Sequence, residues 1–270
     1  MPKPLAAITG ASSGLGELYA RKLAPTHDLL LIARNKNRLQ ELAAELSAAH
    51  GSEVAILEAD LSDTPQIKRV AERIASQPQL EMLINNAGFG DRGAFWEADI
   101  EVLDKMHQLH INALLRLSHA ALRVLVPKNR GAIINLSSVA AFARRPGSAG
   151  YSATKSWVAA FSEGLYVDLK NKGSAVVVQA LCPGYTYTAF HDVMRMDRRK
   201  IAGPSLWLTA EQVVSDSLAA LPRGDLYVIP GWRYRLMVAL LNILPRRLKF
   251  RAAAAASRQP AAPLDRTNMP

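Results

Sequence analysis

The sequence predicts a doubly wound α/β fold, in which helices cover both faces of a parallel sheet. Short apolar runs alternate with longer segments whose apolar residues recur at three- and four-residue spacing, the pattern of consecutive strand–helix–strand units. A glycine-rich turn follows the first apolar run directly. With 270 residues and 49% hydrophobic content, the chain can bury one large core, and we expect a single domain over residues 1–251.

The apolar runs are the predicted strands, and the periodic segments between them are the predicted helices. Both faces of a parallel sheet are buried, so its strands are apolar throughout rather than alternating with polar residues. In chain order, the strands are expected at residues 5–9, 29–33, 54–58, 82–85, 132–136, 175–181 and 226–230, and the helices at 15–23, 38–50, 66–75, 102–126 and 151–170.

The net charge of +10 is unevenly distributed. Much of the excess lies late in the chain among apolar residues, and neither an aromatic-rich basic strand nor zinc-ligand spacing accompanies it. We therefore expect no nucleic-acid partner. Cys182 is the only cysteine, which excludes an intrachain disulfide and a thiolate metal cluster, and no metal site is predicted.

Residues 232–251 combine basic side chains with an apolar stripe, as an interfacial helix does. This helix can pack on the protein's own core, on a second subunit or on a membrane surface, and packing on the core or on a second subunit is favoured. No apolar run reaches the roughly 18 to 20 residues of a membrane span, and the amino terminus enters a strand without a cleavable leader. We expect a cytoplasmic protein, with peripheral membrane contact through 232–251 as the alternative, and a disordered tail at 252–270.

The glycine-rich turn is the first candidate binding site. It joins a predicted strand to a predicted helix, where backbone N–H groups and the helix dipole can receive a pyrophosphate. Glycine is needed because a β-carbon would block both the dinucleotide and the tight turn. The candidate cofactor-binding residues of this turn are Gly10, Ser12, Ser13, Gly14, Leu15 and Gly16.

Arg34 follows the second predicted strand, where an acidic residue would hold the ribose hydroxyls of NAD. A guanidinium can bind the additional 2′-phosphate of NADP, so the sequence predicts NADP(H) rather than NAD(H). Ligands of such sheets lie at the carboxyl ends of the strands, and the ends of the third and fourth strands add further candidates. These are Asp60, Leu61, Asn86, Ala87 and Gly88.

Tyr151 and Lys155 form a Tyr-x-x-x-Lys pair, and Ser138 precedes them. Residues four apart on a helix share one face, so the ammonium of Lys155 can favour the charged form of the phenol. When a carbonyl carbon accepts hydride, negative charge develops on its oxygen, and two donors aimed at that oxygen stabilise it. Tyr151 and Ser138 are the predicted donors.

Together these motifs resemble those of the short-chain dehydrogenase/reductase family over about residues 5–190. The resemblance implies a Rossmann-type fold with a seven-stranded parallel sheet, and an enzyme that interconverts a carbonyl and an alcohol by hydride transfer with NADP(H). It also implies a homodimer or homotetramer. The matching segments are Thr9-Gly10-x-x-x-Gly14-x-Gly16, Asn85-Asn86-Ala87-Gly88, Asn112, Ser138, Tyr151-x-x-x-Lys155 and Pro183-Gly184.

The resemblance gives each catalytic candidate a role. Tyr151 would exchange a proton with the substrate oxygen, and Ser138 would orient that oxygen. Lys155 would hold the nicotinamide ribose and lower the pKa of the phenol. Asn112 would anchor a water that relays protons from Lys155.

In the same family, the segment after the sixth strand meets the nicotinamide and closes over the substrate. The candidate contacts are Pro183, Gly184 and Thr188, with Thr186 as the alternative to Thr188. The apolar side chains of the expected lid, residues 185–207, favour a hydrophobic ketone or aldehyde, although packing on the body would explain them equally. A protein that binds NADP(H) as a sensor or scaffold without turnover is the alternative function.

Overall fold

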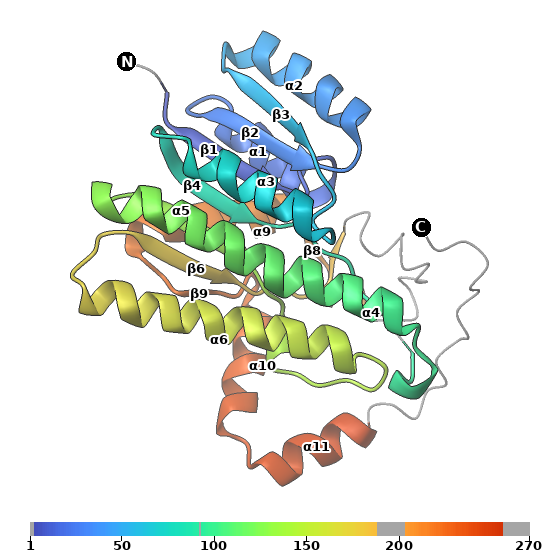
Figure 1. Cartoon of the computed structure of the whole chain (residues 1–270). Helices are drawn as coiled ribbons and strands as arrows, with labels where there is room; N and C mark the ends of the chain where they lie inside the picture. Colours follow the sequence, from blue (N-terminus) through green and yellow to red (C-terminus); the bar gives the residue numbers. More distant parts are fainter. Residues whose placement is uncertain (1–2, 92, 188–202, 256–270) are drawn as a thin grey trace.

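The computed structural model describes residues 3–91, 93–187 and 203–255 (Figure 1). Its centre is a seven-stranded sheet with the order β3-β2-β1-β4-β5-β6-β9, in which all neighbours are parallel, as predicted. The order reverses between β1 and β4, and ligands of such sheets bind at this switch point. The strands are β1 (Leu5–Thr9), β2 (Asp28–Ala33), β3 (Val54–Glu58), β4 (Leu80–Asn85), β5 (Ala132–Leu136), β6 (Val177–Leu181) and β9 (Tyr227–Val228).

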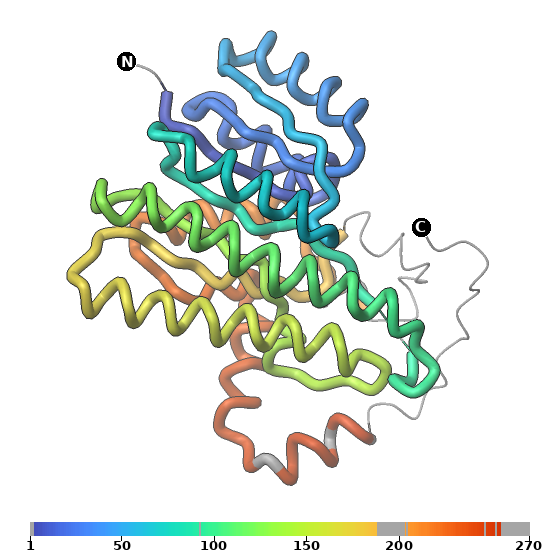
Figure 2. The backbone as a smooth tube through the Cα atoms, in the orientation of Figure 1, coloured from blue at the N-terminus to red at the C-terminus, as the bar shows by residue number. Residues whose placement is uncertain are grey.

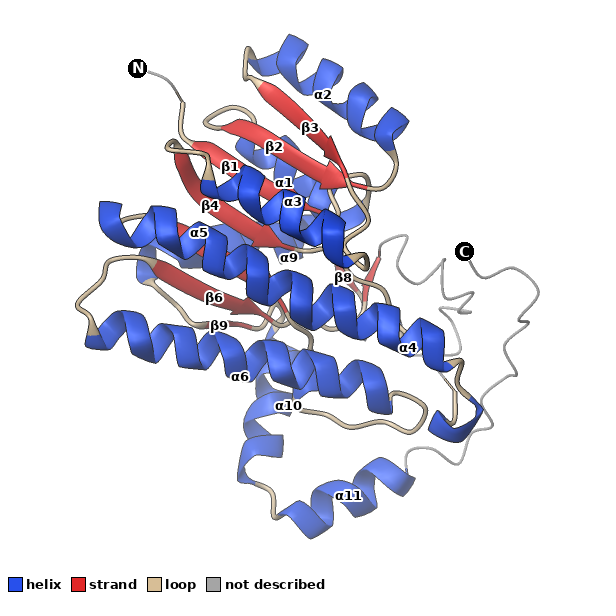
Figure 3. Cartoon of the chain, viewed as in Figure 1, coloured by secondary structure: helices blue, strands red, loops and turns tan. Residues whose placement is uncertain are grey.

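Helices cover both faces of this sheet (Figure 3). Successive side chains of a strand point to opposite faces, so Ala6 and Ile8 of β1 join one apolar core while Leu5 and Ala7 join the other. The first core is completed by α1 (Gly14–Leu23), α2 (Lys36–His50) and α9 (Ala210–Ala220), and the second by α3 (Thr64–Ala75), α5 (Leu114–Lys128) and α6 (Ala149–Asn171).

The segment predicted as one helix at 102–126 contains a π-helical turn. It consists of α4 (Ile100–His107), the turn η2 (Gln108–Ala113) and α5, and Figure 2 shows the backbone passing through all three. A π turn winds the chain more widely than an α-helix and is frequently found at functional sites.

A second, two-stranded sheet joins the ends of the predicted lid. β7 (Thr186–Tyr187) pairs in parallel with β8 (Leu208–Thr209), and the Trp207 ring stacks on Tyr187 at 4.9 Å between centroids. Thr188 and most of the predicted lid lie outside the described residues.

The carboxy-terminal region forms two helices, α10 (Trp232–Ile243) and α11 (Arg246–Ala255), instead of the single helix expected at 232–251. Pro245 separates them because the residue before a proline avoids the helical conformation, and Leu244 is extended with φ −63° and ψ 137°. Residues 252–255, which were expected in the disordered tail, belong to α11, because alanine is the strongest helix former. The rest of the expected tail lies outside the described residues. In Figure 1, α11 extends away from the sheet.

Tyr234 attaches α10 to the body of the protein. Its buried hydroxyl accepts a hydrogen bond from the N–H of Tyr185 at 3.0 Å and donates one to the carbonyl of Leu206 at 2.6 Å. Burial raises the pKa of Tyr234 to about 12, so the hydroxyl keeps the proton that it donates. A β-carbon on Gly184 would lie 2.0 Å from the Tyr234 ring, so this glycine is required for the helix to dock. The start of α10 therefore packs on the protein's own core.

Candidate active site

Ser138, Tyr151 and Lys155 come from two adjoining segments at the carboxyl end of β5. Ser138 follows β5, and its Oγ accepts a hydrogen bond from the N–H of Ala140 at 3.1 Å, which fixes the short 3-10 turn Val139–Ala141. Tyr151 and Lys155 lie in the first two turns of α6. Ser156 Oγ of the same helix donates to the carbonyl of Ala141 at 3.1 Å, which ties the turn to the helix.

Lys155 is buried and lies beside the predicted acid/base. Its Nζ donates to the carbonyl of Leu136 at 2.8 Å and lies 5.8 Å from the centre of the Tyr151 ring, within the range of a cation–π contact. Burial disfavours the charged form and lowers the pKa of Lys155 to about 8. A cavity of about 10 Å³ adjoins the lysine, lined by apolar side chains and by Thr9, Asn85 and His110.

The glycine turn has the geometry that a pyrophosphate requires. Gly10 and Gly14 have positive φ, +65° and +59°, which other residues seldom adopt. A β-carbon on Gly16 would lie 2.3 Å from the carbonyl oxygen of Gly10, so a side chain there would fill the turn. Ser13 begins α1 without capping it through its side chain. This turn and the uncapped helix end fit the pyrophosphate of a dinucleotide.

Asn86 holds the ends of β1 and β4 together. Its side-chain nitrogen donates to the carbonyl of Thr9 at 2.9 Å, and Thr9 Oγ1 accepts the N–H groups of Asn86 at 2.9 Å and Ala87 at 3.0 Å. The residues from the glycine turn and those from the Asn86–Gly88 turn thus form one continuous edge. The structure gives the Asn86 side chain this supporting contact, while direct contact with a cofactor stays a prediction.

Arg34 and Asp60 lie close together at the ends of β2 and β3. The Asp60 carboxylate accepts hydrogen bonds from Ser62 Oγ at 2.7 Å and Ser62 N–H at 2.8 Å. Burial raises the pKa of Asp60, but the Ser62 hydrogen bonds and the positive charges of Arg34 and Lys105 outweigh this effect, and the net pKa is lowered. Asp60 is therefore ionised, and Arg34 is exposed at the same edge of the sheet.

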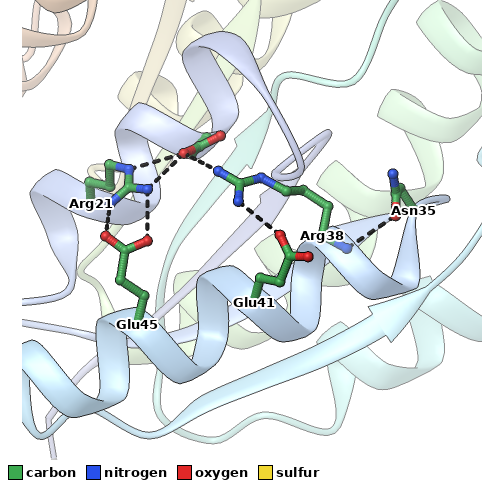
Figure 4. A network of polar contacts seen from close by, with 6 residues as sticks. Arg21, Asn35, Arg38, Glu41 and Glu45 are labelled. Atoms are coloured by element: carbon green, nitrogen blue, oxygen red, sulfur yellow. Dashed lines mark hydrogen bonds and ion pairs between the residues drawn. The ribbon is translucent and has the colours of Figure 1, made fainter.

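Arg38, the other nearby guanidinium, is held elsewhere. Figure 4 shows it on α2 beside Asn35, Glu41 and Arg21. Its Nη atoms pair with Glu17 at 2.8 Å and Glu41 at 3.0 Å. Of these two arginines, Arg34 is the one available for a phosphate at the end of β2.

Asn112, the fourth catalytic candidate, lies in the π turn η2. Its side chain is exposed, and Nδ2 donates to Gln108 Oε1 at 2.7 Å within the π turn. His110, two residues earlier, is buried, and its ring lies 6.0 Å from the Tyr151 ring in an edge contact. The water-anchoring role of Asn112 stays a prediction, and the residue that the structure places against Tyr151 is His110.

Sequence reasoning missed His110 although a signal was present. Met106, His110, Ala113 and Leu117 recur at three- and four-residue spacing and are all buried, so they form the inward face of the segment. Asn112 is exposed and lies on the opposite, outward face of the segment.

Comparison with known protein families supports an oxidoreductase that acts on alcohol or carbonyl groups. The short chain dehydrogenase family matches residues 4–199, and the chain belongs to this family.

Two solved structures illustrate the relationship. The chain is 32% identical to a short-chain dehydrogenase from Sphingobium yanoikuyae in complex with NADPH, covering 97% of this chain and 99% of the other with a TM-score of 0.81. It is 28% identical to a bulky-bulky ketone specific alcohol dehydrogenase from Comamonas testosteroni, covering 99% of each chain with a TM-score of 0.76.

This chain covers a smaller share of one curated relative. The very-long-chain 3-oxoacyl-CoA reductase from Anas platyrhynchos is 29% identical over 195 residues, which are 70% of this chain and 62% of the relative.

Proposed function

We propose that the protein is an NADP(H)-dependent oxidoreductase that interconverts an apolar ketone or aldehyde and the corresponding alcohol. The observation that carries the proposal is the buried Lys155, held against the Tyr151 ring on α6, with Ser138 at the adjoining end of β5. This arrangement places a proton donor, a hydrogen-bond donor and a cation at one edge of the sheet. The glycine turn lies at the same edge.

NADP(H), when bound, supplies or accepts the hydride. In the direction of reduction, the Tyr151 hydroxyl gives its proton to the substrate oxygen while Ser138 Oγ donates a hydrogen bond to the same oxygen. The tyrosinate then regains a proton from solvent. Lys155, with a pKa of about 8, is mostly charged at neutral pH and stabilises the tyrosinate electrostatically.

The choice of NADP(H) rests on Arg34. It is exposed at the end of β2, and neither an ion pair nor a hydrogen bond joins it to another part of the described chain. Arg38, by contrast, is paired with Glu17 and Glu41. The NADPH complex of the Sphingobium yanoikuyae relative supports the same choice.

The choice of an apolar substrate rests on the aromatic residues after Gly184. Tyr185 and Tyr187 pack against Trp207 with centroids 5.4 Å and 4.9 Å apart, at the two ends of the predicted lid. A group of aromatic side chains at this position favours a substrate with a bulky hydrophobic carbonyl. The Comamonas testosteroni relative, described as specific for bulky-bulky ketones, supports this substrate class.

The exposed surface of α10 and α11 is proposed as a peripheral contact with an anionic membrane. Trp232, Leu236, Leu240, Ile243 and Phe250 are each more than half exposed, and the segment 232–251 contains basic residues without an acidic one. Within the described ranges, every helix is too short or too polar to cross a membrane.

Leu115 and Val167, exposed on α5 and α6, are consistent with a homodimer or homotetramer.

The test is NADPH oxidation by the purified protein with ketones and aldehydes of graded chain length, and with Tyr151→Phe as the control. Turnover that rises with chain length and falls by at least about a hundredfold in the variant supports the proposal. Tight NADPH binding without turnover on any substrate would favour the sensor or scaffold alternative. Near-normal turnover in Tyr151→Phe would remove the tyrosine from the mechanism.

A further inference from the structure

His110 bridges the turn after β4 and the catalytic face of α6. Its Nε2 lies 3.2 Å from the backbone nitrogen of Phe89, and its Nδ1 lies 2.9 Å from Thr154 Oγ1. Thr154 is the residue immediately before Lys155, and its hydroxyl donates to the carbonyl of Tyr151 at 2.9 Å. One side chain thus contacts both halves of the proposed site.

These contacts fix the tautomer of the ring. The Phe89 N–H can only donate, so Nε2 is the acceptor. The Thr154 hydroxyl gives its proton to the Tyr151 carbonyl, so its oxygen accepts a proton from Nδ1. His110 is therefore neutral, with Nδ1 protonated and both nitrogens occupied. Burial, together with electrostatic repulsion from Lys155 and His107, holds the pKa of His110 well below its ordinary value, which agrees with a neutral ring.

The ring also sets the spacing between the two halves. It lies between the rings of Phe89 and Tyr151, with centroids 6.2 Å and 6.0 Å away. A β-carbon on Gly88 would lie 2.7 Å from His110 Nε2, so the turn approaches the imidazole as closely as a glycine permits. Any movement of the turn toward α6 is blocked by the ring, and movement away breaks the Phe89 hydrogen bond.

We propose that His110 is a positioning residue, which fixes the Asn86–Phe89 turn relative to Tyr151 and Lys155 so that a cofactor seated on the turn meets the acid/base. The inference rests on the proposed function, in which NADP(H) binds at the candidate residues Asn86, Ala87 and Gly88 of this turn. His110 acts through its two hydrogen bonds and not as a proton carrier.

Three substitutions separate the two hydrogen bonds. A glutamine at position 110 can place its amide oxygen where Nε2 accepts from Phe89, whereas an asparagine can place its amide nitrogen where Nδ1 donates to Thr154. An alanine makes neither contact. His107→Ala, a change at a partly buried histidine on α4, is the matched control.

The first readout is the Kd for NADPH, which needs no substrate, together with thermal unfolding to establish that each variant is folded. We expect His110→Ala and His110→Asn to raise the Kd for NADPH about tenfold, because neither keeps the bond to the turn. His110→Gln, which can keep that bond, and His107→Ala, which leaves His110 in place, should stay within about threefold of the wild type. Where a carbonyl substrate is turned over, kcat follows the same order.

An unchanged Kd for NADPH in folded His110→Ala would overturn the inference, as would a glutamine variant as damaged as the alanine variant. If His110→Ala does not fold, the comparison of the Gln and Asn variants decides the question alone. Failure of the wild type to turn over any carbonyl would count against the proposed reaction, while the order of NADPH affinities would still decide the role of His110.

Discussion

Lys155 is hydrogen-bonded to Leu136: its Nζ donates to the last carbonyl of β5 at 2.8 Å. Its own backbone carbonyl accepts the hydroxyl of Ser137 at 2.7 Å, so the last residue of β5 and the residue that follows the strand hold both ends of the lysine. The position of the ammonium is therefore set by the sheet and does not depend on Tyr151. This anchoring is compatible with the two roles proposed for Lys155, beside the phenol of Tyr151 and at the cofactor ribose.

The first prediction concerns the pH dependence of stability. Burial lowers the pKa of Lys155 from 10.5 to about 8, so between these values the unfolded chain binds more protons at this residue than the folded chain. Stability contributed by Lys155 therefore rises with pH across this window. Relative to Lys155→Met, which does not titrate there, the wild type should gain up to about 3 kcal/mol of unfolding free energy between pH 8 and 10.5.

Chemical denaturation of both proteins at several pH values checks this gain. Every other titrating group is present in both proteins, so the informative quantity is the difference in unfolding free energy between the wild type and Lys155→Met. A difference that stays constant from pH 7.5 to 10 would show that the lysine is not desolvated in solution.

The second prediction concerns cofactor choice. Arg34→Ala should weaken NADPH binding by about ten- to a hundredfold, the scale of one charge-assisted hydrogen bond to a phosphate, and leave NADH binding nearly unchanged. Arg38→Ala is the matched control, because Arg38 pairs with Glu17 and Glu41 at the surface. Titration of NADPH and NADH into the wild type and the two variants measures the ratio of the two affinities. Equal affinities of the wild type for NADPH and NADH, or a larger effect at Arg38, would contradict the role of Arg34.

The third prediction concerns the docking of α10. Gly184→Ala places a β-carbon 2.0 Å from the Tyr234 ring, and we expect a loss of about 2 kcal/mol or more of stability from overpacking. In a Tyr234→Leu background, the same change should cost much less, because the ring is gone. Gly164→Ala in α6 has nothing within 4 Å of the added carbon and should be neutral or stabilising. Thermal unfolding of these variants measures the effect. If Gly184→Ala were as stable as Gly164→Ala, the contact between Gly184 and Tyr234 would be refuted.

The fold was predictable because its strands are buried on both faces and therefore appear as continuous apolar runs. Ser138, Tyr151 and Lys155 were predictable because their motif places them at the carboxyl end of β5 and the start of α6. The burial of His110 was predictable from the spacing of its apolar neighbours, but its contact with Gly88 was not. Tyr234 likewise contacts Gly184, and in both cases the two partners are far apart in the sequence, so no local pattern predicts the contact.

The break at Pro245 is a different case. The residue before a proline avoids the helical conformation, so the division of 232–251 into α10 and α11 follows from a local rule that the apolar and basic pattern concealed. Periodicity alone describes a face and does not locate where a helix ends.

The last prediction concerns the proposed membrane contact of α10 and α11. Arg235, Arg247 and Arg251 are exposed on these helices beside the apolar residues Leu240 and Phe250. Each basic residue near an anionic surface contributes about 1 kcal/mol, so changing all three to Glu should weaken binding to phosphatidylserine vesicles at low salt at least a hundredfold. Changing Lys68, Arg73 and Arg130 to Glu alters the net charge equally on other exposed surfaces and should have little effect.

Vesicle co-sedimentation measures the wild type and both variants. A wild type that does not sediment with anionic vesicles would leave the surface without a membrane role. If the first variant instead changes the molecular mass measured by light scattering, the surface binds a second copy of the chain.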